Sequence, residues 1–410
     1  MRVVLSAVLA GGALVAPGPA AAAPATPAPT AKTSAGVRLA PGVVYRRFDI
    51  ATRSGPARAH LLTVDLRDPR VSVGLLYPGD VGARARLSSL ADARKAVGGV
   101  NGDFFNIVES QHPGGEATGA PVGPAITGGR HLKAAVPDGQ RFGPVLPPGT
   151  STREVLGIGE DGRARLGRLT LDGSVSTESG TVPLRGFNQY ALPVGSVGVF
   201  TSDWGAASRT RATCGTDSER AAPCSDSVHE VTVREGRVIA VADAPGRGRI
   251  RPGTEVLVGR DAGAAELRGL SVGDRVTVRH RLVDPRSHVA YRFAIGGYPV
   301  LRDGEPLPGL DDGAGALRTA AGIADDGYRL LLLALDGGPE FRTGLTVAGL
   351  AAAMRDAGAV DAFNLDGGGS STLVTRRPGA KTVTVRNHPG DGGERPVANG
   401  IGVFSGASRS

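Results

Sequence analysis

Three aspartates follow short apolar segments and stand beside glycine, and they are the acids best placed for chemistry: Asp103, Asp336 and Asp366. A single Asp-Gly pair is typical of a turn, which is the plain interpretation in a chain with 63 glycines. Asp366 differs because an unbroken run of three glycines and two serines, Gly367 to Ser371, follows it. Such a loop lets a ligand approach the backbone closely and offers N–H groups to an anion or to sugar hydroxyls. We therefore predict a functional site at Asp366.

Two arginines lie close to these acids in the sequence. Arg318, next to Thr319, precedes a long apolar run, and Arg395 lies in the glycine-rich loop before the last apolar segment. Either arginine alone is typical of a surface charge. Together with the acids and the Gly-Ser loop, they favour recognition of an anionic, hydroxylated substrate.

Short strands must position the three acids. Residues 329–335 form a continuous apolar run, as expected for a strand buried on both faces, and residues 361–365 form a second strand candidate. A very short strand at residues 100–101 precedes the third acid. We expect these strands to share one sheet and to hold the three aspartates in one cleft with Asn101 and Arg318.

Two helices are predicted beside these strands. The first covers Leu87 to Val97, with Ser88 or Ser89 as its N-terminal cap. The second begins after Thr346, which caps it, and Gly358 closes it. Each helix separates two strand candidates, so the same order of elements occurs near both ends of the folded part.

The first residues of the chain resemble an export signal. Arg2 is followed by an apolar run over residues 3–16 and by an alanine-rich segment that suits cleavage, so we interpret residues 1–23 as a signal peptide. The alternative is an uncleaved anchor, but the run is shorter than the roughly 20 residues that span a bilayer. Residues 24–36, rich in Pro, Ala and Thr, are expected to be a disordered linker. The mature protein is expected to be secreted and extracellular, without membrane insertion after signal cleavage.

We expect residues 37–405 to form one catalytic domain. Within it, residues 150–290 contain short β-rich pieces separated by Gly-Asp and Asp-Gly turns, and they predict a β-rich middle section. The sequence thus predicts an α+β fold with a mixed β-sheet core, few helices and this β-rich middle section.

Charge and cysteines limit the partners. The formal net charge is +8, but the arginines are scattered and no basic helix or basic-aromatic cluster occurs, so no nucleic-acid partner is expected. A basic surface instead suits anionic cell-wall polymers. Cys214 and Cys224 lie in one polar segment, and in an exported protein a disulfide between them outranks a metal site, which needs further Cys or His ligands nearby.

Several common catalytic sites are excluded by their motifs. The chain has no Gly-x-x-x-x-Gly-Lys phosphate loop, no His-Glu-x-x-His and no Gly-x-Gly-x-x-Gly that opens a helix after a strand. Its seven histidines are too dispersed to indicate a histidine-centred site. The acids and arginines must therefore carry the chemistry. We expect no required cofactor; a divalent metal is compatible with the many acids, but no ligand spacing demands one.

A series of motifs resembles one known family. The segments "VNGDFF", "GAPVG", "RTAAG", "LALDGG", "AFNLDGGGSSTLV" and "GERPVANGIGVF" occur in this order, and over about residues 95 to 404 the chain resembles the phosphodiester glycosidase family. It departs from the family at Leu317, where proline is usual, and at Gly390, where serine is common. By position, the resemblance implies that Asp336, Asp366 and Arg318 are catalytic and that the substrate-binding residues are Asn101, Asp103, Thr319, Asn364, Gly367, Gly368, Gly369, Ser370, Ser371, Arg395 and Asn399.

The resemblance implies hydrolysis of a sugar-1-phosphodiester to free sugar and a phosphate monoester. Asp366 or Asp336 would act as nucleophile or as base for water, with the other orienting it, while arginine and backbone N–H groups stabilise the departing phosphate. The alternatives are non-catalytic binding of a phosphate-containing cell-surface glycan and a role in exopolysaccharide assembly. Binding tolerates replacement of aspartate by asparagine, whereas hydrolysis does not.

Overall fold

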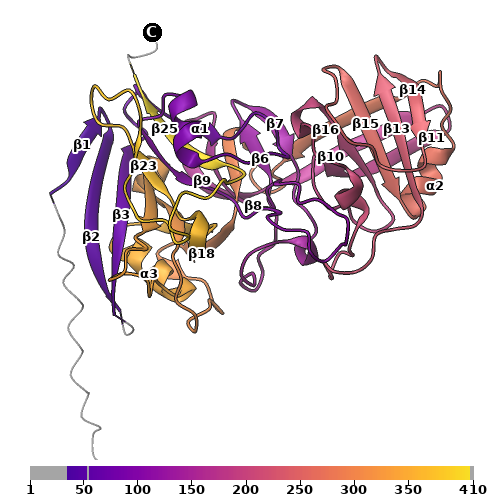
Figure 1. Cartoon of the computed structure of the whole chain (residues 1–410). Coiled ribbons are helices and arrows are strands. Elements are labelled where there is room, and N and C mark those ends of the chain that lie inside the picture. The colour runs from indigo at the N-terminus through magenta and orange to yellow at the C-terminus, as the bar shows by residue number, and fades with distance from the viewer. Residues whose placement is uncertain (1–34, 53–54, 407–410) are drawn as a thin grey trace, which may run out of the picture. The chain divides into compact units, whose positions relative to one another are not determined.

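The apolar runs that precede two of the predicted acids meet in an eight-stranded sheet, several of whose other strands are labelled in Figure 1. In the computed structural model, which describes residues 35–52 and 55–406, the run at 329–335 is buried from its second residue onward, as its composition predicts. The strands of this sheet, in spatial order, are β1 (Val37–Ala40), β2 (Val43–Thr52), β3 (Gly55–Asp65), β21 (Arg329–Leu335), β20 (Thr319–Ala324), β22 (Asp361–Leu365), β18 (Tyr298–Arg302) and β19 (Glu305–Pro306).

The register of three of these strands gathers the predicted site at one edge of the sheet. Thr319, the first residue of β20, lies opposite Ala334 of β21 and Leu365 of β22, and both pairings are antiparallel. Consequently β21 and β22 run in the same direction and end beside the start of β20. Asp336, Arg318 and Asp366 are therefore brought to the same sheet edge although they are far apart in sequence.

The strand before Asp103 belongs to a different sheet, which corrects the expectation that one sheet carries all three acids. β5 (Gly98–Asn101) pairs with β23 and β25 rather than with β20, β21 or β22. Its sheet has five strands, in the order β24 (Thr384–Val385), β23 (Leu373–Thr375), β5, β25 (Gly400–Ser405) and β4 (Val71–Leu76).

The middle of the chain forms two further sheets of short strands. One has the order β7 (Arg130–Lys133), β6 (Ala125–Thr127), β17 (Tyr291–Gly296), β8 (Glu154–Gly159) and β9 (Ala164–Arg168). The other has the order β14 (Arg237–Ala242), β13 (Val228–Arg234), β15 (Thr254–Arg260), β12 (Val197–Phe200), β11 (Gly180–Phe187), β10 (Thr170–Thr177) and β16 (Thr277–Val283). The described residues thus have the predicted α+β fold, with a mixed β-sheet core, few helices and a β-rich middle section.

Three α-helices accompany the sheets in the part of the chain that the structure describes: α1 (Leu87–Ala93), α2 (Ala262–Arg268) and α3 (Val347–Asp356). The predicted start of α3 is confirmed, because the Thr346 hydroxyl accepts a hydrogen bond from the Gly349 N–H at 2.9 Å. Gly358, with φ of 97°, follows α3 in the left-handed conformation that glycine tolerates. Short 3-10 turns cover Asp138–Gln140, Ser202–Trp204, Thr210–Thr213, Asp325–Gly327 and Gly368–Ser370.

The first helix differs from its prediction at both ends. It stops at Ala93 rather than continuing to Val97, and no side chain of a preceding residue caps it. The Glu394 carboxylate, from a distant loop, instead accepts hydrogen bonds from the Ser88 N–H at 2.6 Å and the Ser88 hydroxyl at 2.5 Å. The serines at the helix start suggested that one of them caps the helix locally. Instead, the Ser88 donors are satisfied by a carboxylate that is distant in sequence.

The predicted signal peptide, residues 1–23, and residues 24–34 of the predicted linker lie outside the described residues. The first strand begins at Val37. The boundaries given above for the signal peptide, the linker and the domain stay predictions. No helix among the described residues is long and apolar enough to cross a membrane.

Candidate functional site

Asp366 is held at the end of β22 by the neighbouring sheet. Its N–H donates to the Gly102 carbonyl at 2.8 Å, and its own carbonyl accepts from the Asn101 amide at 2.7 Å. Burial raises the pKa of this half-buried carboxyl to about 7, and the Asp103 carboxylate adds to the rise, although Ser370 and Arg395 oppose it. At neutral pH both protonation states are therefore populated, which suits a group that reacts or exchanges protons.

Asn101 and Thr319 join the two sheets at this edge. The Asn101 carbonyl oxygen accepts hydrogen bonds from the Thr319 hydroxyl at 2.8 Å and from the Thr372 N–H at 3.0 Å. The Thr319 hydroxyl also lies 3.2 Å from the Ser371 hydroxyl. All four groups are buried. We conclude that Asn101, Thr319 and Ser371, predicted as substrate ligands, hold strand ends and the Gly-Ser loop in place.

Asp103 is a buried acid with one unused oxygen. Its N–H donates to the Asn399 side chain at 2.9 Å, and one carboxylate oxygen accepts from the Gly123 N–H at 2.6 Å. The other oxygen is buried and has no partner among the described residues. Burial raises the pKa of Asp103, and the buried Lys133 ammonium opposes that rise.

Lys133 was not predicted from the sequence. Its ammonium group is fully buried and donates to the carbonyls of Val122, Gly123 and Ala134, at 3.1, 2.5 and 2.5 Å. Three donors are needed for these bonds, so the charged form fits the geometry even though burial lowers the pKa of Lys133. Lys133 therefore places a cation near Asp103 at the end of β7.

Arg318 is buried, and two of its donors are engaged by the protein itself. Its Nε donates to the Leu345 carbonyl at 3.0 Å and its Nη2 to the Ala314 carbonyl at 3.1 Å. Burial also lowers the pKa of Arg318. The guanidinium thus fixes the segment before α3 and has fewer donors left for a phosphate than the sequence suggested.

Unpartnered polar groups lie next to Arg318. Tyr298 and Asn364 face each other across the β18–β22 pair, and both side chains are buried. The Tyr298 hydroxyl and both polar atoms of the Asn364 amide have no hydrogen-bond partner among the described residues. Buried polar groups are nearly always satisfied by protein, water or ligand. These atoms, with the free oxygen of Asp103, are therefore candidates for contact with a bound molecule.

Arg141, also missed by sequence reasoning, presents a guanidinium without hydrogen bonds to the residues described. It lies 5.4 Å from the ring centre of Phe104 and 5.7 Å from that of Tyr298, and these rings stack on each other. Burial lowers the pKa of Arg141, while Tyr298 and Asp103 oppose that shift. The aromatic pair therefore holds a cation with all five donors free near Asp103.

The Gly-Ser loop after Asp366 is covered by the loop of residues 388–395. Gly368 has φ of 59°, and a side chain on Gly369 would collide with Asp391. Arg395 donates from Nε to an Asp391 oxygen at 2.9 Å and from Nη1 to the Ser370 hydroxyl at 3.3 Å. Glycine is thus required here for close approach between two loops, as well as for any approach of ligand.

Asp336 lies in a separate hydrogen-bonded group. One carboxylate oxygen accepts from His60 at 2.9 Å, and the other accepts from His388 at 2.8 Å and from the Gly338 N–H at 2.7 Å. Burial disfavours the charged form, but these three hydrogen bonds outweigh it and hold the pKa of Asp336 well below its usual range. Its partners differ from those of Asp366, so the structure assigns the two acids to different centres at one sheet edge.

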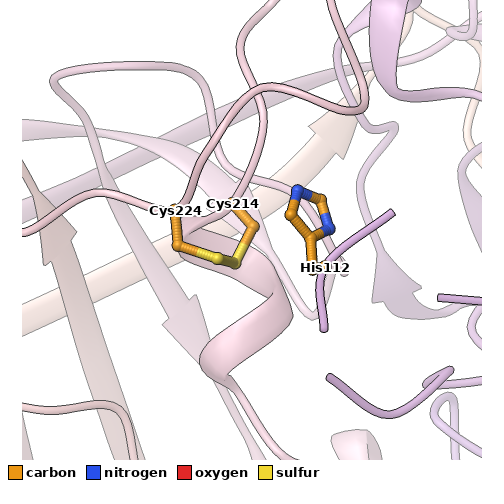
Figure 2. A group of neighbouring side chains, drawn as sticks. All are labelled: His112, Cys214 and Cys224. Carbon is orange, nitrogen blue, oxygen red and sulfur yellow. A yellow bond between two sulfur atoms is a disulfide. The ribbon is translucent and has the colours of Figure 1, made fainter. Parts of the chain in front are cut away.

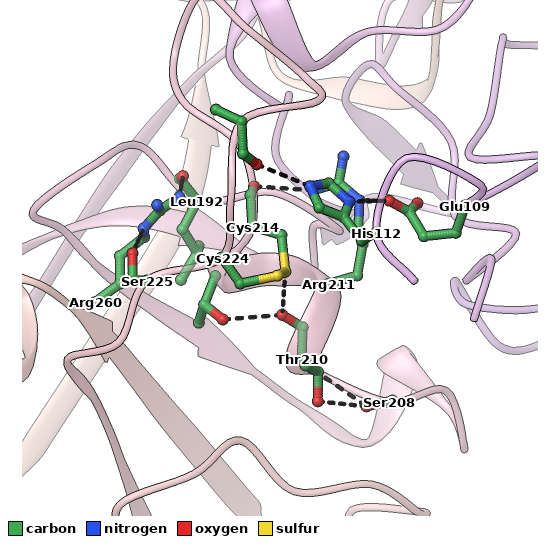
Figure 3. The surroundings of a disulfide bond; sticks show 12 residues. Glu109, His112, Leu192, Ser208, Thr210, Arg211, Cys214, Cys224, Ser225 and Arg260 are labelled. Carbon is green, nitrogen blue, oxygen red and sulfur yellow. Dashed lines mark hydrogen bonds and ion pairs between the residues drawn. A yellow bond between two sulfur atoms is a disulfide. The ribbon is translucent and has the colours of Figure 1, made fainter. Parts of the chain in front are cut away.

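The predicted disulfide is present. Cys214 and Cys224 are bonded, and His112 lies beside them (Figure 2). These three residues form the one cluster of potential metal ligands among the described residues, but both sulfurs are used in the disulfide. Figure 3 shows why His112 is fixed there: its Nδ1 lies 2.5 Å from the Glu109 carboxylate, which also pairs with Arg211 at 2.6 Å. The disulfide thus packs against a buried group of hydrogen-bonded and ion-paired side chains, Glu109, His112 and Arg211, whose role is structural.

Reduction of this disulfide is expected to destabilise the folded protein. A disulfide closing a loop of this size typically stabilises by about 2 to 4 kcal/mol, largely by restricting the unfolded chain. Thiol titration and intact mass should show no free thiol before reduction and two after it, and urea unfolding should shift to lower denaturant on reduction. Two free thiols before reduction would contradict the pairing.

A carboxyl with a raised pKa, buried polar groups without partners and a free arginine are features of a ligand-binding or catalytic site. Residues 228–404 match the family described as phosphodiester glycosidase. The match covers less than half of the chain, and over these residues it confirms the resemblance described above. The family supports a glycosidase-type function and a glycan-type substrate.

Solved structures show the same fold. A hypothetical protein from Synechocystis has a TM-score of 0.69 and 21% identity; the match covers 92% of this chain and 64% of that one. This chain therefore spans less than two thirds of that protein. A Burkholderia pseudomallei K96243 protein described as exported has a TM-score of 0.66 and 26% identity, covering 86% of this chain and 75% of its own.

A third structure is the zebrafish N-acetylglucosamine-1-phosphodiester alpha-N-acetylglucosaminidase catalytic domain, auto-inhibited by its pro-peptide. It has a TM-score of 0.42 and 17% identity, and the match covers 92% of this chain and 89% of that one. No curated protein sequence matches the chain.

Proposed function

We propose that this protein is a secreted hydrolase that cleaves a sugar-1-phosphodiester into free sugar and a phosphate monoester. The observation that carries the proposal is Asp366, a carboxyl with a pKa raised to about 7 at the start of a Gly-Ser loop inside the family match. A carboxyl poised near neutral pH matches the acid-base or nucleophilic role that glycoside cleavage requires.

The reaction breaks the bond between the anomeric carbon and a phosphate oxygen, which keeps the electron pair. Water supplies the oxygen that replaces it on the carbon. Because the phosphate leaves as a stable anion, the main demands are a carboxylate against the positive sugar ring and cations against the phosphate. Asp366 meets the first demand, and Arg141 meets the second.

Among the described residues, Arg141 is the arginine near this centre with all of its donors free. Arg318 uses two donors on backbone carbonyls, and Arg395 is paired with Asp391, whereas the Arg141 guanidinium stacks on aromatic rings and makes no hydrogen bond to the described residues. A planar guanidinium with unused donors suits two-pronged contact with phosphate. We therefore assign the phosphate to the side of Asp103 and Tyr298.

Replacing Arg141 by Lys is expected to lower kcat/KM by about tenfold to a hundredfold. Lysine keeps the charge but loses the fork and the flat stacking surface. The matched control is Arg67→Lys, because Arg67 also stacks on a tyrosine, at 4.7 Å, but away from this site. Equal kcat/KM values for both variants would remove Arg141 from the proposed phosphate contact.

The alternatives are a role in exopolysaccharide assembly and binding of a phosphate-containing surface glycan without hydrolysis. One observation favours the binding function: the Asp336 carboxylate is saturated by three donors, so only one of the two expected acids is free to react directly.

Incubation of the secreted protein with a panel of sugar-1-phosphodiesters, with and without EDTA, separates these functions. Hydrolysis predicts equal amounts of free sugar and phosphate monoester, and EDTA reports any metal requirement. Tight binding of the panel without release of sugar would favour the binding function and end the proposal of hydrolysis.

A further inference from the structure

Four side chains from distant parts of the sequence form a continuous chain of hydrogen bonds. The Tyr45 hydroxyl lies 2.8 Å from His60 Nδ1, and His60 Nε2 lies 2.9 Å from one Asp336 oxygen. His388 Nδ1 lies 2.8 Å from the other Asp336 oxygen. β2 and β3 supply the first two residues, the end of β21 supplies the acid, and the loop after β24 supplies the last histidine.

The direction of each hydrogen bond follows from the charge on Asp336. Hydrogen bonds from both histidines and Gly338 keep this carboxyl ionised, so it can only accept, and each histidine must donate to it. Burial lowers the pKa of His60, so its neutral form donates from Nε2 and accepts from Tyr45 at Nδ1. His388 likewise donates from Nδ1, which leaves the lone pair of the neutral ring on Nε2.

His388 lines a pocket, to which its Nε2 lone pair is open. Its side chain is 75% exposed, whereas the Asp336 side chain is 5% exposed. The pocket has a volume of about 360 Å³, and its lining includes His388, Gly337, Gly338, Gly390 and Arg342. Glu394 also lines it, but that carboxylate is bonded to Ser88. Of the charged groups beside His388, Asp336 is also bonded to His60, and Arg342 has no side-chain partner among the described residues.

The pocket adjoins the loop that follows Asp366. A side-chain carbon built on Gly390 would lie 3.4 Å from the Gly368 carbonyl oxygen, so the pocket wall and the Gly-Ser loop are in contact. The pocket beside His388 and the loop that follows Asp366 are therefore neighbours at one sheet edge.

We propose that His388 is the base that takes the proton from the attacking water, and that Asp336 and His60 are positioning residues that fix its tautomer. This inference rests on the proposed hydrolysis. In the step, the water oxygen bonds to the anomeric carbon, the bond from that carbon to the phosphate oxygen breaks, and the water proton moves to His388 Nε2. The phosphate monoester keeps the electron pair, so atoms and charge balance.

A purely structural role fits the arrangement less well. An ionised carboxylate is costly to bury, and a scaffold needs no exposed histidine at the end of the hydrogen-bonded chain. A histidine oriented by a buried carboxylate, with its other nitrogen open to a pocket, is instead the arrangement that general-base catalysis uses.

His388→Asn tests the base directly, because the asparagine amide can still donate to Asp336 but has no Nε2. We expect kcat to fall by about a hundredfold to ten-thousandfold with KM little changed. His288→Asn is the control, since His288 is an exposed turn histidine with φ of 52° that asparagine tolerates. Equal kcat in both variants would overturn the role of His388.

A second measurement does not depend on activity. Nitrogen-15 NMR of histidine-labelled protein should show the neutral His388 ring protonated at Nδ1, and Asp336→Asn should change that tautomer. A ring protonated at Nε2 overturns the positioning role of Asp336 even if the enzyme is active. If the wild type hydrolyses no sugar-1-phosphodiester, the proposed function fails and the base assignment fails with it, whereas active wild type with equally active His388→Asn rejects the base alone.

Discussion

Asp366→Asn is expected to reduce hydrolysis of a sugar-1-phosphodiester by at least about a hundredfold to ten-thousandfold while the fold stays intact. Asparagine keeps the size and turn preference of aspartate but removes its charge. The backbone bonds of this residue to Gly102 and Asn101 do not involve the carboxyl and should persist. Steady-state kinetics, with circular dichroism as the check on folding, measure the effect.

Asp361→Asn is the matched control for this experiment. Asp361 lies at the other end of β22, is also half-buried, and burial raises its pKa as well. Its oxygen accepts from the Asp303 N–H at 3.2 Å, a bond that an asparagine oxygen can also make. If Asp366→Asn retains kcat within about threefold of the Asp361→Asn variant, the binding function replaces hydrolysis.

The sequence predicted those parts of the site that depend on local patterns. Residues 330–335 are apolar without interruption, so they had to form a buried strand, and the residue that follows them had to emerge at a sheet edge. The Thr346 cap and the turn after β22 likewise depend on neighbours within four residues. Local chemistry therefore located Asp336 and Asp366, though not the groups around them.

The missed residues depend on contacts between distant segments. His60 and Asp336 are 276 residues apart, and their contact follows only from the pairing of β3 with β21. Lys133 is a lone lysine near a short strand, with no spacing that marks it as buried. Seven scattered histidines gave no pattern because the histidine pair is assembled by the sheet and by a loop. Strand order, which a single sequence does not determine, was the missing information.

The two acids are expected to affect stability in opposite directions. The Asp366 pKa, raised to about 7, means that the native protein binds a proton between about pH 4 and pH 7 that the unfolded chain does not. Stability therefore falls as pH rises through this range. Asp336 has a lowered pKa, so its contribution is present above about pH 4 and is lost as pH falls below that value.

We therefore predict that Asp366→Asn stabilises the protein above pH 7 by up to about 4 kcal/mol, which is about three pKa units at 1.36 kcal/mol each. The gain should shrink toward pH 4, where the native carboxyl is already neutral. Asp336→Asn should instead destabilise by about 2 to 4 kcal/mol at pH 6, because His60, His388 and Gly338 lose a charged acceptor. That loss should shrink below pH 4.

Urea unfolding of the wild type and both variants at pH 4, 6 and 8 measures these differences, with equal slopes confirming that the unfolded states are comparable. The decisive comparison is pH 8, at which only the Asp366 variant should exceed the wild type. An Asp366→Asn variant less stable than the wild type at pH 8 would show that its carboxylate is favourably solvated or paired in the native state. The Asp366 carboxyl would then be ionised at neutral pH like an ordinary surface acid. The proposed chemistry, which depends on a carboxyl that is partly protonated at neutral pH, would lose its basis.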